Sequence, residues 1–216
     1  METSSLTKFT VAILAGGRST RMGTDKALVA LNNKSLIEHV IARASDLGQG
    51  ETILITNQPG AYAHLGLPMF GDVVPNKGSL GGIYAAISYS QNPYTLALAC
   101  DIPFVKPDLL RYMLSRLTAS GGPFDVIVPR AKGFWQGLHA IYGKACLAPI
   151  RECLDADDLH VIRFYPKVRV CYLNEAEWAP FDPDGVSFFN VNTPDELEQA
   201  RRIVAGEAYS PPARDS

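Results

Sequence analysis

The sequence predicts a three-layer α/β domain with a mainly parallel central sheet. Short apolar runs rich in β-branched residues recur along the chain, and their continuous character is typical of strands buried on both faces. Amphipathic segments of helical period separate these runs, and a repeated strand–helix order requires right-handed crossovers. In sheets of this kind ligands bind outside the carboxyl ends of the strands, so we look for functional residues there.

Seven runs are predicted to form strands. Each is short and apolar, and each is bounded by turn or helix signals. In chain order they cover residues 9–14, 52–56, 94–100, 125–129, 137–142, 168–173 and 188–191.

Two helices are indicated in the first half of the chain. Ser35 and Glu38 have the spacing of a capping box, and they precede a helix whose apolar face runs through residues 36–44. Gly48 is the predicted stop of this helix. Residues 82–89 form the second helix, which is entered through a glycine-rich loop.

Two further helices have proline near their start. Pro107 suits the first turn of a third helix, because its missing N–H would be unpaired there in any case. Thr193 as N-cap, Pro194 at the first helical position and Glu196 at the third begin a last helix. We expect that helix to continue to about Ala205.

Composition limits the domain count and the partners. The 216 residues predict one domain over 9–205 with flexible ends at 1–8 and 206–216, and a hydrophobic content of 47% suits a globular chain. A net charge of −2 and the lack of an apolar run near ~20 residues argue against nucleic acid and membrane as partners. The four cysteines have neither C-x-x-C nor zinc spacing, which favours reduced thiols in the cytoplasm.

A glycine-rich basic loop over residues 14–28 follows the first strand. Its glycines allow close backbone approach to a ligand, and the amides of residues 15–17 are expected to cup a phosphate. Arg21 and Lys26 supply cations that offset triphosphate charge and stabilise a leaving pyrophosphate. The loop has neither Walker A nor G-x-G-x-x-G order. A lone basic loop is more often a solvated turn, but the complete string favours a phosphate site.

Carboxylates and a second glycine loop are expected near the same edge. Asp101 follows the third strand, where it can hold Mg²⁺ or simply cap the next turn. Gly81 and Gly82 allow a base or a phosphate to approach the backbone, although paired glycines are also ordinary turn residues. Asp72 can accept a hydrogen bond from a base or ribose, or cap a turn.

Amides and a histidine in the second half give further candidates. Asn190 and Asn192 precede the last helix, and Asn192 can help to hold a metal or a phosphate or can form an Asx turn. Gln136 and His139 lie in an aromatic segment that can line a pocket for a flat heterocycle, but a buried core histidine is the favoured alternative. No Ser/His/Asp order is present, so covalent catalysis is not indicated.

Four strings carry a resemblance to a known family, at residues 14–28, 78–82, 100–104 and 190–194. With them the chain resembles, over about residues 9–205, the molybdenum cofactor guanylyltransferases, which are MobA-like nucleotidyltransferases of Rossmann-like fold. The resemblance implies Mg²⁺-dependent transfer of GMP from GTP to the molybdopterin-bound molybdenum cofactor, with release of pyrophosphate.

The resemblance also implies roles for individual residues. Metal binding falls to Asp101, and catalysis to Asp101 with Arg21 and Lys26. The nucleotide contacts it implies are Leu14, Ala15, Gly16, Gly17, Lys26, Asn57, Asp72, Gly81 and Gly82. Beside these, the residues themselves make Asn190, Asn192, Gln136 and His139 candidates for acceptor, phosphate or second metal contacts.

The chain departs from the family pattern at three places. Ser79 and Gly137 stand where proline is usual, and residues 158–160 replace a common arginine pair. Two of these departures fall in the half expected to bind the pterin. Two alternatives therefore stay open: a cytidylyl- or other nucleotidyltransferase acting on a related pterin or on a sugar or alcohol phosphate, and a non-catalytic GTP-binding module for cofactor delivery. Other cofactor-biosynthesis proteins are further expected partners.

Overall fold

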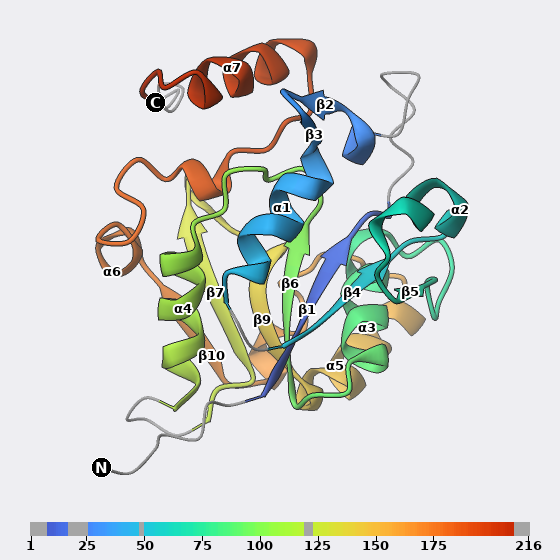
Figure 1. Cartoon of the computed structure of the whole chain (residues 1–216). Helices are drawn as coiled ribbons and strands as arrows, with labels where there is room; N and C mark the ends of the chain where they lie inside the picture. Colours follow the sequence, from blue (N-terminus) through green and yellow to red (C-terminus); the bar gives the residue numbers. More distant parts are fainter. Residues whose placement is uncertain (1–7, 17–25, 48–49, 119–122, 210–216) are drawn as a thin grey trace, which may run out of the picture.

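The computed structural model describes residues 8–16, 26–47, 50–118 and 123–209. Its described part contains an eight-stranded sheet in the order β10-β7-β9-β6-β1-β4-β5, with β8 paired to β7 (Figure 1). Parallel pairs join β1 to β4 and β6, β4 to β5, and β7 to β10, whereas β9 runs antiparallel to β6 and β7. The mainly parallel three-layer fold class is confirmed.

The strands of this sheet are mostly those expected from the apolar runs. Their bounds are β1 Phe9–Leu14, β4 Glu51–Ile55, β5 Met69–Phe70, β6 Tyr94–Ala99, β7 Val126–Ala131, β8 Phe134–Trp135, β9 His139–Gly143 and β10 Val170–Leu173. All six residues of β1 are buried, because it lies between β4 and β6 with helices over both faces. The two-residue strands β5 and β8 are too short to leave a period in the sequence.

Helices cover both faces of the sheet. One face packs against α1 Leu36–Ser45, α4 Pro107–Ser115 and α6 Glu175–Trp178, and the other against α3 Gly78–Tyr89 and α5 Leu147–Asp155. The short α2 Pro59–Tyr62 follows β4, and α7 Pro194–Val204 lies beyond the upper end of the sheet in Figure 1. The 3₁₀ turns are η1 Lys26–Leu28, η2 Ala63–Leu65, η3 Arg116–Thr118, η4 Lys144–Cys146, η5 Tyr165–Lys167 and η6 Val186–Phe188.

The expected helix starts are present. Ser35 N–H donates to Glu38 Oε2 at 2.7 Å, which closes the capping box of α1. Ser35 Oγ also donates to Glu38 Oε2, and the side-chain and backbone hydrogen bonds from Ser35 together lower the pKa of Glu38. Thr193 Oγ1 accepts from Glu196 N–H at 3.2 Å, and Pro107 begins α4 as predicted. The helix predicted from residue 82 begins earlier, at Gly78, so the second glycine loop forms its first turn.

The prediction of a strand at residues 188–191 is wrong. The chain there leaves η6 as irregular backbone, and Val191 N–H donates to Asp101 O at 3.0 Å instead of joining a ladder. Phe188, Phe189 and Val191 are all buried, which explains the strand-like apolar pattern. Their burial comes from packing across the end of the sheet, and this pattern cannot be told from a strand by sequence alone.

Helix α7 and the residues after it pack against a short hairpin. Strands β2 Ala30–Leu31 and β3 Lys34–Ser35 pair antiparallel, and Leu31 shares a hydrophobic cluster with Leu197 and Ala200 of α7. Tyr209 is buried in the same cluster, so packed structure extends into the tail expected from residue 206. None of the helices in the described ranges has the length and apolarity that a membrane crossing requires.

Candidate active site

Four polar side chains meet beyond the carboxyl end of β6. Lys26 Nζ donates to both Asp101 Oδ2 and Asn192 Oδ1, and Asn190 Nδ2 donates to Asp101 Oδ1 at 3.1 Å. Lys26 is 75 residues from Asp101 and 166 residues from Asn192 along the chain. We call these four residues, Lys26, Asp101, Asn190 and Asn192, the Lys26–Asp101 cluster. The sequence pointed to each residue separately, and the fold brings them together.

The backbone fixes this cluster from three directions. Asp101 stands two residues after β6, where Cys100 N–H donates to Leu14 O of β1 at 3.3 Å. The Asp101 carbonyl accepts from Val191 N–H, which ties residues 190–192 to the sheet end. Asn192 N–H donates to Glu196 Oε2 at 2.7 Å, so the cap of α7 also holds this segment. The Asn192 backbone N–H thus takes part in the cap of α7, whereas its side chain accepts from Lys26 and does not form the Asx turn.

Burial makes the charge balance of the cluster important. The side chains of Lys26 and Asp101 are 10% and 17% exposed. A carboxylate withdrawn from water is costly unless a cation or hydrogen-bond donors compensate it. Lys26 and Asn190 together supply that compensation, one donor group to each carboxylate oxygen. These two contacts hold the Asp101 carboxylate in place at the end of the sheet.

The donors in this cluster fit a hard divalent cation. Asp101 contributes carboxylate oxygens and Asn192 contributes its amide oxygen, while Asn190 presents its Nδ2 to Asp101. The described residues contain no group of three or more His, Cys, Asp or Glu side chains that could form a protein-only metal cage. Mg²⁺ needs no such cage, since it commonly binds one or two carboxylates together with substrate phosphates and water. The chemistry of the cluster therefore suits a cation that arrives with phosphate.

The first glycine loop begins beside this cluster. Ala15 N–H donates to Ile55 O at 2.9 Å, so this amide belongs to the sheet and is not free to cup a phosphate. Gly16 has open space where a side chain would project, because no described atom lies within 4 Å of the place that a Cβ would take. Gly17 and Arg21, which were predicted to bind phosphate, lie outside the described residues.

Asn57 and Asp72 form a reciprocal pair. Asn57 Nδ2 donates to Asp72 Oδ2 at 2.8 Å, and Asp72 N–H donates to Asn57 Oδ1 at 2.9 Å. They follow the neighbouring strands β4 and β5, which places them at the same carboxyl edge. Gly71 between them is a residue that sequence reasoning missed: a Cβ there would lie 3.1 Å from Asn57 Oδ1. A larger residue at this position would therefore crowd the Asn57 side chain.

Gly81 and Gly82 have different surroundings in the first turn of α3. A Cβ on Gly81 would lie 2.8 Å from the Lys77 Cβ and 3.4 Å from the Val74 carbonyl, which is too close for ordinary packing. A Cβ on Gly82 would meet only Leu14 Cδ2, at 3.8 Å. Close packing against Lys77 therefore explains a glycine at position 81. Gly82 lies beside Leu14, the first residue of the first glycine loop.

The side chains of His139 and Gln136 pack against other parts of this protein. His139 is 3% exposed, and within the described residues neither ring nitrogen meets hydrogen-bond geometry with a partner. Burial lowers its pKa to about 4, and a polar contact with the Ser187 backbone opposes this only in part. Gln136 Nε2 donates to Ala131 O at 3.0 Å, within its own hairpin. His139 is buried as the core-histidine alternative expects, but its ring nitrogens lack the hydrogen-bond partners that a satisfied core histidine would have among the described residues.

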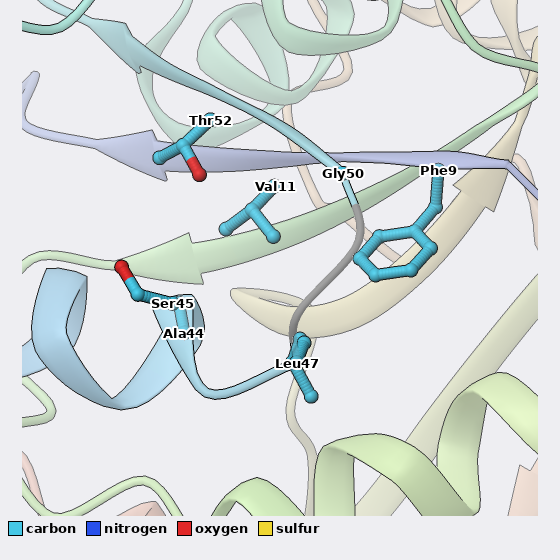
Figure 2. Close-up of a pocket in the computed structure, with 7 residues that line it drawn as sticks. All are labelled: Phe9, Val11, Ala44, Ser45, Leu47, Gly50 and Thr52. Carbon is cyan, nitrogen blue, oxygen red and sulfur yellow. The ribbon is translucent and has the colours of Figure 1, made fainter.

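The cavity shown in Figure 2 lies at the other end of the sheet. Its volume is about 200 Å³, and its lining includes Phe9 and Thr52, near the beginnings of β1 and β4. The Lys26–Asp101 cluster lies beyond the ends of the parallel strands, and a strand rises about 3.3 Å per residue. This cavity is therefore remote from the cluster.

Comparisons with known proteins identify relatives of this chain. Residues 11–168 match the model of the MobA-like NTP transferase domain. A probable molybdenum cofactor guanylyltransferase of Pelotomaculum thermopropionicum is 40% identical over 192 residues, which cover 89% of this chain and 91% of the relative. A protein of the same name from Peptoclostridium acidaminophilum is 34% identical over 199 residues, covering 90% and 89%.

A solved structure extends the match to three dimensions. Molybdopterin-guanine dinucleotide biosynthesis protein A from Archaeoglobus fulgidus superposes with a TM-score of 0.78 at 27% identity, covering 92% of this chain and 100% of that one. The sequence matches and this fold agree with the resemblance carried by the four strings. The chain belongs to the molybdenum cofactor guanylyltransferase family of MobA-like NTP transferases.

Proposed function

We propose that this protein transfers GMP from GTP to the molybdenum cofactor, forming the guanine dinucleotide cofactor and releasing pyrophosphate. The observation that carries the proposal is the Lys26–Asp101 cluster, which combines a cation, a carboxylate and two amides at the sheet edge where ligands bind. The names of the relatives support the choice of guanylyl donor and cofactor acceptor.

The proposed reaction is a direct in-line displacement. A terminal phosphate oxygen of the acceptor attacks the α-phosphorus of GTP, and the bond from that phosphorus to the β-bridging oxygen breaks as pyrophosphate leaves. An ionised phosphate needs no general base, which agrees with the lack of an evident base in the cluster. Lys26 and Arg21 are proposed to neutralise charge on the departing pyrophosphate.

Asp101 is proposed to hold Mg²⁺ with help from Asn190 and Asn192. When bound there, Mg²⁺ supplies Lewis-acid polarisation of the phosphate oxygens. Ion-pair and hydrogen-bond partners already orient the Asp101 carboxylate, so little rearrangement of that side chain is required.

The nucleoside part of GTP is assigned to the strand ends beside the cluster. Asn57 and Asp72 hold each other in place and are proposed to contact ribose or base. Gly82 and Gly16 allow close backbone approach, and the Leu14 side chain lies beside Gly82. The backbone contact expected of Gly17, and the close packing of Gly81 at the α3 start, complete the proposed nucleotide site.

The acceptor side is assigned to the segment that contains Gln136 and His139. Gln136 is partly exposed, and its Nε2 donates to the backbone carbonyls of Ala131 and Phe134, which a ligand can replace. We propose it as an acceptor contact. His139 is buried against Phe188, with ring centroids 5.0 Å apart, so we assign it to supporting this region rather than touching the acceptor.

Pyrophosphate release with purified protein, Mg²⁺, the molybdenum cofactor and one nucleotide at a time tests the function. Release with GTP and not with CTP, ATP or UTP is expected, and it should require the acceptor. Selective release with CTP would favour a cytidylyltransferase. GTP binding without pyrophosphate release would favour a cofactor-delivery module and would overturn the proposal.

A further inference from the structure

The Lys26 ammonium lies where a metal-binding site would place its cation. Lys26 Nζ donates to Asp101 Oδ2 and Asn192 Oδ1 at the same time. We propose that Lys26 is a place-holder: its ammonium occupies the cation position while nucleotide is absent, and it moves to the phosphates when the metal–nucleotide complex binds. This inference rests on the proposed function, because it uses the assignment of Asp101 to the metal.

Competition follows from the identity of the atoms involved. A carboxylate oxygen and an amide oxygen are hard donors of the kind Mg²⁺ selects. An ammonium group has three N–H donors and no acceptor, so it binds the same oxygens in place of a metal. Lys26 engages both oxygens in the structure, so a cation bound to either one would meet the ammonium at close range.

Burial explains why a place-holder is useful here. Lys26 as a whole is 8% exposed, and the Asp101 side chain is 17% exposed. In contrast, the Lys167–Glu152 pair has side chains 53% and 62% exposed, where water can solvate each charge separately. An uncompensated carboxylate at the Asp101 position would destabilise the nucleotide-free protein. Lys26 removes that penalty without a bound metal.

Electrostatics then sets the order of binding. Like charges a few ångströms apart in a partly buried site repel strongly, and the repulsion doubles for a divalent cation. Free metal should therefore bind weakly while Lys26 stays in place. A nucleoside triphosphate changes this balance, because it brings its own chelated metal and offers Lys26 new anionic partners. The metal is expected to enter with the nucleotide and not before it.

A purely structural ion pair makes a different prediction. If Lys26 only stabilises the fold, its replacement lowers stability with or without metal. If it is a place-holder, its replacement leaves Asp101 uncompensated and available, so the protein becomes less stable in EDTA but regains that stability when Mn²⁺ is added. The metal-dependent recovery separates the two roles.

The test is titration of nucleotide-free protein with Mn²⁺, followed by electron paramagnetic resonance and by thermal unfolding. Lys26→Met should bind Mn²⁺ at least about tenfold more tightly than wild type, since a repelling charge is removed. Lys26→Arg keeps the charge and should bind weakly. Lys167→Met removes an exposed lysine of another carboxylate pair and should match wild type. Adding Asp101→Asn to Lys26→Met should abolish the gain.

Equal or weaker Mn²⁺ binding by Lys26→Met, including no measurable binding, refutes the place-holder. If that variant is unstable, Lys26→Gln keeps an N–H donor without the charge and should show the same gain. The outcome is independent of turnover: failure of pyrophosphate release in wild type counts against the proposed function, while the nucleotide-free titration tests Lys26 alone.

Discussion

Acid conditions should destabilise the protein through His139. Its ring is buried and neutral, with a pKa of about 4, whereas an unfolded histidine titrates near 6.5. Between these values the unfolded state binds more protons, so stability is fully present above about pH 6.5 and is lost as the pH falls towards 4. Each pH unit well inside this window costs about 1.4 kcal/mol, which gives a loss of about 2 kcal/mol between pH 7 and pH 5.

The assay is urea unfolding at several pH values for wild type and His139→Phe. Phenylalanine keeps an aromatic ring against Phe188 but cannot be protonated. The difference in unfolding free energy between the two proteins should therefore shift by about 2 kcal/mol in favour of the variant from pH 7 to pH 5. His160→Gln is the matched control, because it removes a histidine whose side chain is 80% exposed. A difference that stays constant with pH would refute the reasoning.

Three further outcomes are expected. Asp101→Asn should abolish pyrophosphate release while circular dichroism still reports a folded protein; near-wild-type turnover would exclude the metal role. Gly81→Ala should lower the unfolding free energy by about 1–3 kcal/mol, because its Cβ would lie 2.8 Å from that of Lys77. Gly82→Ala, with ordinary contact distances, should be far milder in the same denaturation assay, and equal losses would contradict this packing argument. Thr193→Ala should cost about 1 kcal/mol in thermal or urea unfolding through its lost cap, with Thr193→Ser as the control that keeps the hydroxyl.

The centre of the sheet was predictable because local pattern and tertiary environment agree there. The run at residues 9–14 matches β1 residue for residue, since a strand buried on both faces needs apolar side chains at every position. The α7 start was predictable for a similar reason: the cap of Thr193 and Glu196 is made within four residues. Residues 188–191 misled the same reasoning, because their burial arises from packing over the sheet end.

The sequence by itself determined the fold class, most strands of the sheet, the helix caps and the residue types of the candidate site, because these depend on side chains near one another in the chain. Only the tertiary structure decided that Lys26 holds Asp101 and Asn192, that Asn57 and Asp72 pair, and that His139 is buried without a described hydrogen-bond partner. These contacts join segments up to 166 residues apart. They follow from strand order and crossovers, which bring distant strand ends to one edge, and no local periodicity records them.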